Sequence, residues 1–132
     1  MAHSYHAFHL NLIKVAYNNL LQHSPFDDAA EGSVEAEFIM RLEELIAGME
    51  KDKTDLGLGQ ELLSRIPLSY TELVPLIPRD LFWFFGGDCL HYMPDHEIET
   101  YQQLDEMRYE AESNSDNDFN YEAARTRVLG LH

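Results

Sequence analysis

The sequence has a single cysteine, Cys89, so no disulfide can form within one chain. One unpaired thiol is typical of a protein that works in a reducing compartment, and it predicts a cytoplasmic location. The chain also has no apolar run near the roughly 20 residues that a membrane-spanning helix requires. Its first residues, MAHSYHAFHLNL, lack the basic region and cleavage site of a secretory signal. These absences predict a protein that makes no contact with a membrane.

Basic residues are scarce. Nine Lys and Arg stand against 24 Asp and Glu, which gives a formal net charge of −15 in 132 residues. Such a charge repels phosphate backbones, so the sequence predicts no direct binding of DNA or RNA. The imbalance is strongest between Asp95 and Glu122, where ten acids accompany one basic residue, Arg108. This region is either a solvated face that maintains solubility or a docking surface for a basic partner, in the extreme case an imitation of nucleic acid.

Strand signals are also missing, and apolar residues recur at helical spacing almost throughout. The first amphipathic helix is expected from Ser4 to His23, with His3, His6 and His9 as surface residues near its start. A second helix should follow the N-cap Ser33, and a third should end before Pro67. The pair Ser69 and Glu72 has the spacing of a capping box and predicts another short helix.

Start and stop signals are clear in the downstream part of the chain. Pro94 and Asp95 predict the start of a helix that runs to about Glu112, and Asn120 and Gly130 should cap the two ends of a last helix. The polar residues 113–119 between these helices are expected to form a mobile acidic loop. We therefore expect residues 1–132 to form a single all-α domain, a compact bundle of about five to six helices.

The stretch DLFWFFGGDCLHYMPDH, from Asp80 to His96, contains the most unusual composition in the chain. Its apolar register continues across Gly86 and Gly87, which favours one central aromatic helix from Arg79 to Tyr92. Each mid-helix glycine costs on the order of 1 kcal/mol relative to alanine, so close packing of a neighbouring helix or of a ligand should offset the pair. The alternative is a break, with Gly86 as a C-terminal cap and a second short helix that begins at Asp88.

The polar residues of this stretch are the candidate ligand or metal site: Asp88, Cys89, His91 and His96. Thiolate and imidazole groups are ligands that zinc prefers, and a carboxylate-histidine pair could contribute to an iron site. The spacing C-x-H-x4-H matches no familiar zinc module, and only one acid-x-x-His pair is present. The sequence therefore predicts no cofactor, with zinc or iron as the alternative, and no catalytic residue. A buried thiol and a hydrogen-bonded histidine explain the same residues.

Two segments of the chain resemble a known family. The run LFWFFGGDCLHYMPDHEIETYQQLDEMRYEAES, followed by FNYEAAR, is similar to the C-terminal half of an uncharacterised family of small acidic helical proteins from Pseudomonas and related gammaproteobacteria. The resemblance covers about the last 65 residues. It implies a bacterial cytosolic protein and transfers no catalytic residue.

The sequence favours a non-enzymatic protein-protein interaction or regulatory module. Four consecutive aromatics, Phe82 to Phe85, cannot easily all face one small core, and this predicts a homo-oligomer, most simply a homodimer. The expected contact residues are two of these aromatics and an acidic face that would dock a basic protein partner: Trp83, Phe84, Glu99, Glu106 and Glu110. The alternative is an enzyme or a ligand-binding or metal-binding protein with a pocket beside Gly86 and Gly87. A nucleic-acid mimic is the third hypothesis.

Overall fold

The computed structural model describes residues 2–116 and 118–130, and these residues form helices and connecting turns without a strand. In chain order the elements are α1 (Ala2–Leu20), α2 (Val34–Glu50), α3 (Leu56–Ser69), the 3-10 helix η1 (Thr71–Leu76), α4 (Arg79–Phe85), the 3-10 helix η2 (Gly87–Tyr92), α5 (Asp95–Ser113) and α6 (Tyr121–Leu129). The prediction of an all-α fold is confirmed. No helix among these residues is long and apolar enough to span a membrane.

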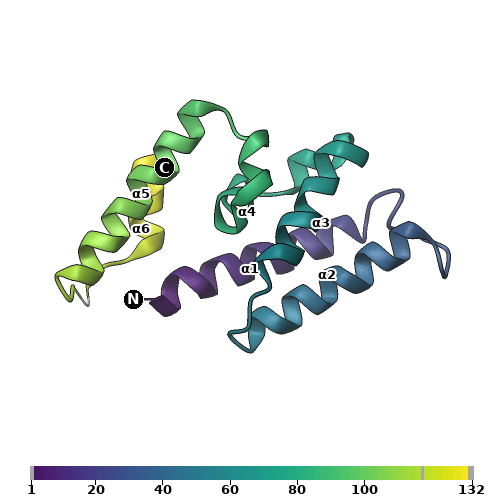
Figure 1. The fold of residues 1–132 in the computed structure, drawn as a ribbon, viewed down its shortest axis with the longest axis horizontal. Coiled ribbons are helices and arrows are strands. Elements are labelled where there is room, and N and C mark those ends of the chain that lie inside the picture. The colour runs from purple at the N-terminus through teal and green to yellow at the C-terminus, as the bar shows by residue number, and fades with distance from the viewer. Residues whose placement is uncertain (1, 117, 131–132) are drawn as a thin grey trace.

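The helices form a body and a projecting pair. α1 and α2 lie side by side, α3 crosses them, and α4 lies between this group and the α5–α6 pair (Figure 1). α5 and α6 pack along each other and contact the body through α4 and α1. Buried apolar side chains from all six α-helices, including Ile13, Phe38, Leu62, Phe82, Leu104 and Ala124, belong to one cluster.

Local signals fixed several helix ends as expected. The Ser33 hydroxyl accepts a hydrogen bond from the Ala36 backbone N–H at 3.1 Å, and Asn120 Oδ1 accepts one from the Ala123 backbone N–H at 3.0 Å. α5 begins directly after Pro94, and Gly130 ends α6 in the left-handed conformation at φ 71°. The caps at Ser33, Asn120 and Gly130 satisfy backbone groups that a helix end leaves without an intrahelical partner, whereas Pro94 makes no side-chain cap.

The expected continuous helix from Arg79 to Tyr92 is wrong. α4 ends at Phe85, and Gly86 and Gly87 adopt φ values of 66° and 57°, after which the chain winds into η2. A positive φ causes a steric clash in L-residues that glycine avoids. The two glycines therefore allow the chain to turn, and they do not serve as close-packing positions inside a continuous helix. The alternative with a break at Gly86 describes the structure, although the second segment is a 3-10 helix and starts at Gly87.

Two further helix predictions are corrected around Pro67. α3 continues through Pro67 to Ser69, and the Pro67 carbonyl accepts a hydrogen bond from the Thr71 hydroxyl at 3.0 Å. The capping box does not form, because the next helix is η1, whose N-cap residue Tyr70 makes no side-chain cap. In the loop 113–119, Ser113 is the last residue of α5 and residue 117 lies outside the described residues. The mobility of this loop stays a prediction.

All four consecutive aromatics find partners within the chain. Phe82 and Phe85 are buried, Trp83 stacks on Tyr101, and Phe84 stacks on the His9 ring at 4.6 Å. Trp83 and Phe84, the two aromatics expected at a contact surface, are only partly buried by these partners. Self-association stays a prediction.

Candidate functional site

The four candidate ligand residues are not brought together. The side chains of Asp88 and His91 are 89% and 79% exposed, and the closest approach between them is 3.8 Å from Asp88 Oδ1 to His91 Nε2. Cys89 is fully buried, and His96 is exposed in the first turn of α5. Among the described residues, no group of three His, Cys, Asp or Glu side chains could hold a metal ion.

Cys89 is a core thiol between η2 and α3. Its Sγ lies 3.6 Å from the Gln60 carbonyl oxygen and 3.6 Å from the Ser64 hydroxyl. Burial raises the pKa of the Cys89 thiol, and the hydrogen bond from Ser64 opposes this shift only in part. Because the thiolate is the reactive form, this environment disfavours nucleophilic or ligand chemistry at Cys89.

Side chains of α3 pack at the position where a pocket beside Gly86 and Gly87 was the alternative prediction. A Cβ atom on Gly87 would lie 2.7 Å from the side-chain amide of Gln60, which donates a hydrogen bond to the Phe85 carbonyl oxygen at 2.9 Å. The contact is reciprocal, because Phe85 packs on Gly59 of α3, where a Cβ would lie 2.2 Å from the ring. The space that could have held a ligand beside Gly87 is therefore filled by a side chain of the neighbouring helix.

The most buried charges lie elsewhere, between α4 and α6. Asp80 is 1% exposed, and both of its carboxylate oxygens accept hydrogen bonds from the Arg125 guanidinium, at 2.6 Å from Nε and 2.9 Å from Nη2. Arg125 also lies over the Phe8 ring of α1. The hydrogen bonds that Arg125 donates to Asp80 raise the pKa of Arg125 further above its usual range. This pair ties α6 to both α4 and α1.

A buried histidine lies beside this ion pair. His9 is fully buried, and its Nδ1–H donates to the Tyr5 carbonyl oxygen at 2.7 Å. Its ring contacts Phe84 of α4 and Tyr121 of α6. Burial lowers the pKa of His9 to about 4, because the charged imidazolium would lose its hydration. His9 is therefore neutral near pH 7, and the expectation that it is a surface residue is wrong.

The seam between α1 and the α5–α6 pair is unusually polar for a helix interface. Arg108 of α5 lies 3.8 Å above the centre of the Tyr5 ring, and Tyr5 meets Tyr121 edge to face. Several buried polar atoms in this seam have no hydrogen-bond partner in the described chain: His9 Nε2, Asp105 Oδ1, Arg108 Nε and Tyr121 Oη. The α5–α6 pair is thus attached through ion pairs, cation–π contacts and aromatic edges in addition to the apolar side chains it contributes to the core.

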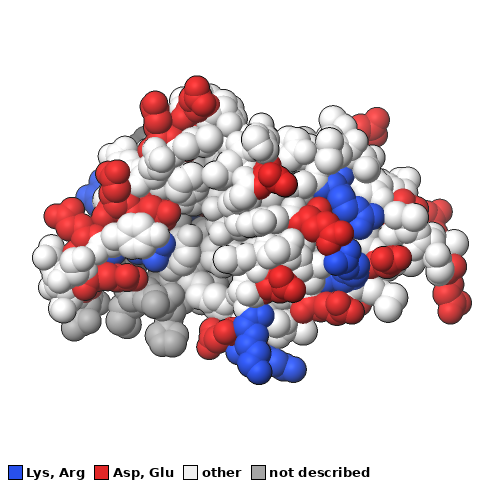
Figure 2. Space-filling view, viewed as in Figure 1, with Lys and Arg blue, Asp and Glu red and all other residues white. Residues whose placement is uncertain are grey.

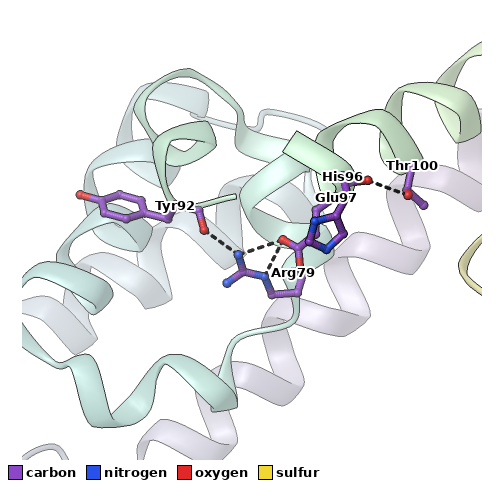
Figure 3. A network of polar contacts seen from close by, with 5 residues as sticks. All are labelled: Arg79, Tyr92, His96, Glu97 and Thr100. Atoms are coloured by element: carbon purple, nitrogen blue, oxygen red, sulfur yellow. Dashed lines mark hydrogen bonds and ion pairs between the residues drawn. The ribbon is translucent and has the colours of Figure 1, made fainter. Parts of the chain in front are cut away.

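Two more polar contacts hold α5 in place. Arg79 donates from Nε and Nη2 to Glu97 Oε1, at 3.1 and 2.9 Å, and from Nη2 to the Tyr92 carbonyl oxygen at 2.6 Å (Figure 3). Further along α5, Asp105 Oδ2 accepts a hydrogen bond from the Trp83 indole N–H at 2.9 Å. The predicted contact residue Trp83 is therefore partly used as an internal anchor.

Arg79 also lines an open cleft between α4, α5 and α6, with a volume of about 440 Å³. Its polar lining includes the Asp80–Arg125 pair, Glu97 and His96, and its apolar lining includes Leu129. Within this lining the charges of Arg79, Arg125, Asp80 and Glu97 balance, and both arginines are engaged by carboxylates. The cleft marks the place where the start of α4 meets the α5–α6 pair.

The outer side of α5 carries the predicted acidic face. Glu99, Glu106 and Glu110 are exposed, and spacings of seven and four residues place them along one side of the helix; we call them the α5 acidic stripe. Among the described residues, none of the three has an ion-pair or hydrogen-bond partner. Carboxylates gather over the α5–α6 pair, and further carboxylates are scattered, together with Lys and Arg, over the middle and the opposite half of the molecule (Figure 2).

Beside this stripe, α5 and α6 enclose an open groove of about 460 Å³. Its floor is apolar and consists of Met107, Ala111, Phe119, Ala123 and Ala124. Its rim includes three acids, Glu110, Asp116 and Asp118. Glu110 belongs to both the groove and the stripe, so the two features form one continuous surface.

The comparison with family models assigns the whole chain. A model described as PA2817-like matches residues 1–132. The chain belongs to the PA2817-like family. This match supports the resemblance that the C-terminal half of the sequence shows to an uncharacterised family. It also includes the N-terminal helices, which the resemblance did not cover. No curated protein and no solved structure matches the chain.

For this PA2817-like chain, sequence reasoning missed the Asp80–Arg125 pair and the burial of His9. Asp80 and Arg125 are separated by 45 positions, and no local spacing connects them. His9 sits one residue after Phe8 on the apolar stripe of α1, and that position was the one available signal of its burial. The exposed acidic stripe, in contrast, follows directly from helical spacing.

Proposed function

We propose that the protein is a non-enzymatic interaction or regulatory module of the cytosol that docks a basic protein partner on the α5 acidic stripe. The observation that carries the proposal is the stripe itself: Glu99, Glu106 and Glu110 are exposed along one side of a helix, and no cation of the described chain neutralises them. Unpaired carboxylates at regular spacing attract a complementary basic surface and speed its encounter.

The attachment of α5 supports this proposal. Arg79 holds the first turn of the helix through Glu97, and Trp83 holds its middle through Asp105. The carboxylates of Glu97 and Asp105 thus anchor α5 to α4, and the carboxylates of the α5 acidic stripe are exposed to solvent. A partner that binds the stripe would meet a helix already fixed in place, which lowers the ordering cost of association.

Affinity capture from an extract of the native host tests the proposal. Exposed charges are screened over roughly 10 Å at 0.1 M salt, so a partner held by the stripe should elute as the salt concentration rises. Reversal of one stripe charge, Glu106→Lys, should lower the yield of that partner.

The matched control is Glu31→Lys, which reverses an exposed acid in the loop between α1 and α2 and changes the net charge by the same amount. It should leave the yield close to that of the wild type. Equal losses in the two variants would show that the whole protein charge, and not the stripe, governs capture.

A further inference from the structure

We propose that the α5–α6 groove receives one bulky apolar side chain from a short basic segment of the partner, while lysines or arginines that flank this side chain pair with Glu110, Asp116 and Asp118. The inference rests on the proposed function and names the chemistry of the segment that would bind. It makes the groove, and not the stripe alone, the centre of the docking surface.

The shape of the groove carries the first step. Ala111 and Ala124 on its floor are 9% and 3% exposed, and Met107 and Phe119 are partly buried beside them. Small residues from two packed helices therefore leave a hollow between larger side chains. A volume of about 460 Å³ is in the range of pockets that hold small organic groups, and a leucine or aromatic side chain fits within it.

The charge of the rim carries the second step. Asp116 and Asp118 are exposed, and Asp116 Oδ1 accepts a hydrogen bond from the Asp118 backbone N–H at 3.0 Å. Together with Glu110 they place three carboxylates around an apolar floor, and Arg127 is the one cation among the described lining residues. This complementarity selects a segment with positive charges on both sides of an apolar anchor and rejects acidic segments.

The groove also continues an existing surface. Glu110 lies on its rim and ends the α5 acidic stripe, so a segment seated in the groove would extend toward Glu106 and Glu99. Interfaces of this kind concentrate their affinity in a buried apolar anchor and use the charged rim for steering and selectivity. The groove thus supplies the anchor that an acidic stripe by itself lacks.

Two short synthetic peptides test the inference, each with lysines flanking one central residue, which is leucine in one peptide and serine in the other. Fluorescence anisotropy gives the Kd of each for the full chain. The leucine peptide should bind at least about tenfold more tightly than the serine peptide, because only leucine buries apolar surface. Ala123→Phe, which fills the groove from an exposed lining position, should bring the two Kd values together.

The control Ala47→Phe adds the same side chain at an exposed site on α2 and should preserve the tenfold difference. Equal binding of both peptides to the wild type, with salt dependence and weakening by Glu106→Lys, overturns the groove and leaves the acidic docking surface standing. A difference between the peptides that persists in Ala123→Phe also overturns the groove. If neither peptide binds the wild type, both the groove and the proposed acidic docking surface fail.

Discussion

Asp80 and Arg125 form a bidentate ion pair that joins α4 to α6, and the Asp80 side chain within it is 2% exposed. Removal of one partner from such a pair leaves a buried charge without compensation. We expect Asp80→Asn to lower the free energy of unfolding by about 2 to 3 kcal/mol, less than for a fully enclosed pair because Arg125 is partly exposed. Urea denaturation measures the change.

The control for this prediction is Glu61→Gln, which breaks the exposed pair between Arg41 and Glu61. Exposed ion pairs contribute little, so this variant should unfold almost like the wild type. Similar losses in the two variants would contradict the role given to the buried pair.

The buried His9 predicts a pH dependence of stability. The pKa of His9 in the native protein is about 4, below the ordinary value of 6.5. Between these two pH values His9 is therefore protonated in the unfolded chain and neutral in the native protein. The free energy of unfolding should therefore fall as the pH drops from about 6.5 to about 4, by roughly 3 kcal/mol in total from this residue. Above pH 6.5 the contribution is constant, because His9 is neutral in both states.

His9→Phe isolates this contribution, since it keeps an aromatic ring against Phe84 and removes the titrating group. Urea denaturation of both proteins at several pH values between about 7 and 4.5 gives two stability profiles. Carboxylates affect both profiles in the same direction, so the difference between them reports His9. Parallel profiles would refute the assignment.

The packing of Phe85 on Gly59 predicts opposite effects for two glycines of α3. Gly59→Ala places a Cβ 2.2 Å from the Phe85 ring and should lower the free energy of unfolding by about 1 to 3 kcal/mol, the usual cost of overpacking. The Cβ atom of Gly57→Ala would make only an ordinary van der Waals contact, with Asp55 Oδ1 at 3.5 Å. It should be neutral or stabilise by up to about 1 kcal/mol, because alanine favours helix. Thermal unfolding measures both variants. Similar midpoints for Gly59→Ala and Gly57→Ala would argue against the contact between Phe85 and Gly59.

Cys89 predicts slow chemical labelling. Its thiol is buried and its pKa is raised, so a maleimide reagent should modify it only after the chain opens. A Ser69→Cys/Cys89→Ser variant moves the thiol to an exposed position and should label rapidly. Mass spectrometry monitors the labelling of both proteins over time. Equally rapid labelling of Cys89 in the native wild type would contradict its burial.

Local signals explain which parts of the fold the sequence predicted. Ser33, Pro94, Asn120 and Gly130 act on backbone groups a few residues away, and each helix end they indicate is present. The continuous helix expected from Arg79 to Tyr92 is wrong because the apolar register is the same for a continuous helix and for two short ones, and so periodicity favoured the simpler of the two. Only the positive φ values of Gly86 and Gly87 distinguish the two, and periodicity does not report φ.

Contacts between distant segments explain what the sequence could not predict. The candidate residues around Asp88 were chosen for being close in sequence, yet Cys89 points into the core while Asp88 and His91 face solvent. The burial of His9 depends on Phe84 and Tyr121, which belong to other helices. The acidic stripe needed one helix only, and helical spacing was enough to place it.

The central claim is that the α5 acidic stripe binds a basic partner, and a pair of triple variants tests it most directly. In one variant Glu99, Glu106 and Glu110 are replaced by lysine, and in the other Asp27, Asp28 and Glu31, exposed acids of the loop between α1 and α2, are replaced in the same way. Quantitative mass spectrometry compares the proteins that each variant and the wild type capture from host extract. The account predicts at least one basic protein that is captured by the wild type and the loop variant and lost with the stripe variant. Identical capture by the two triple variants would contradict it.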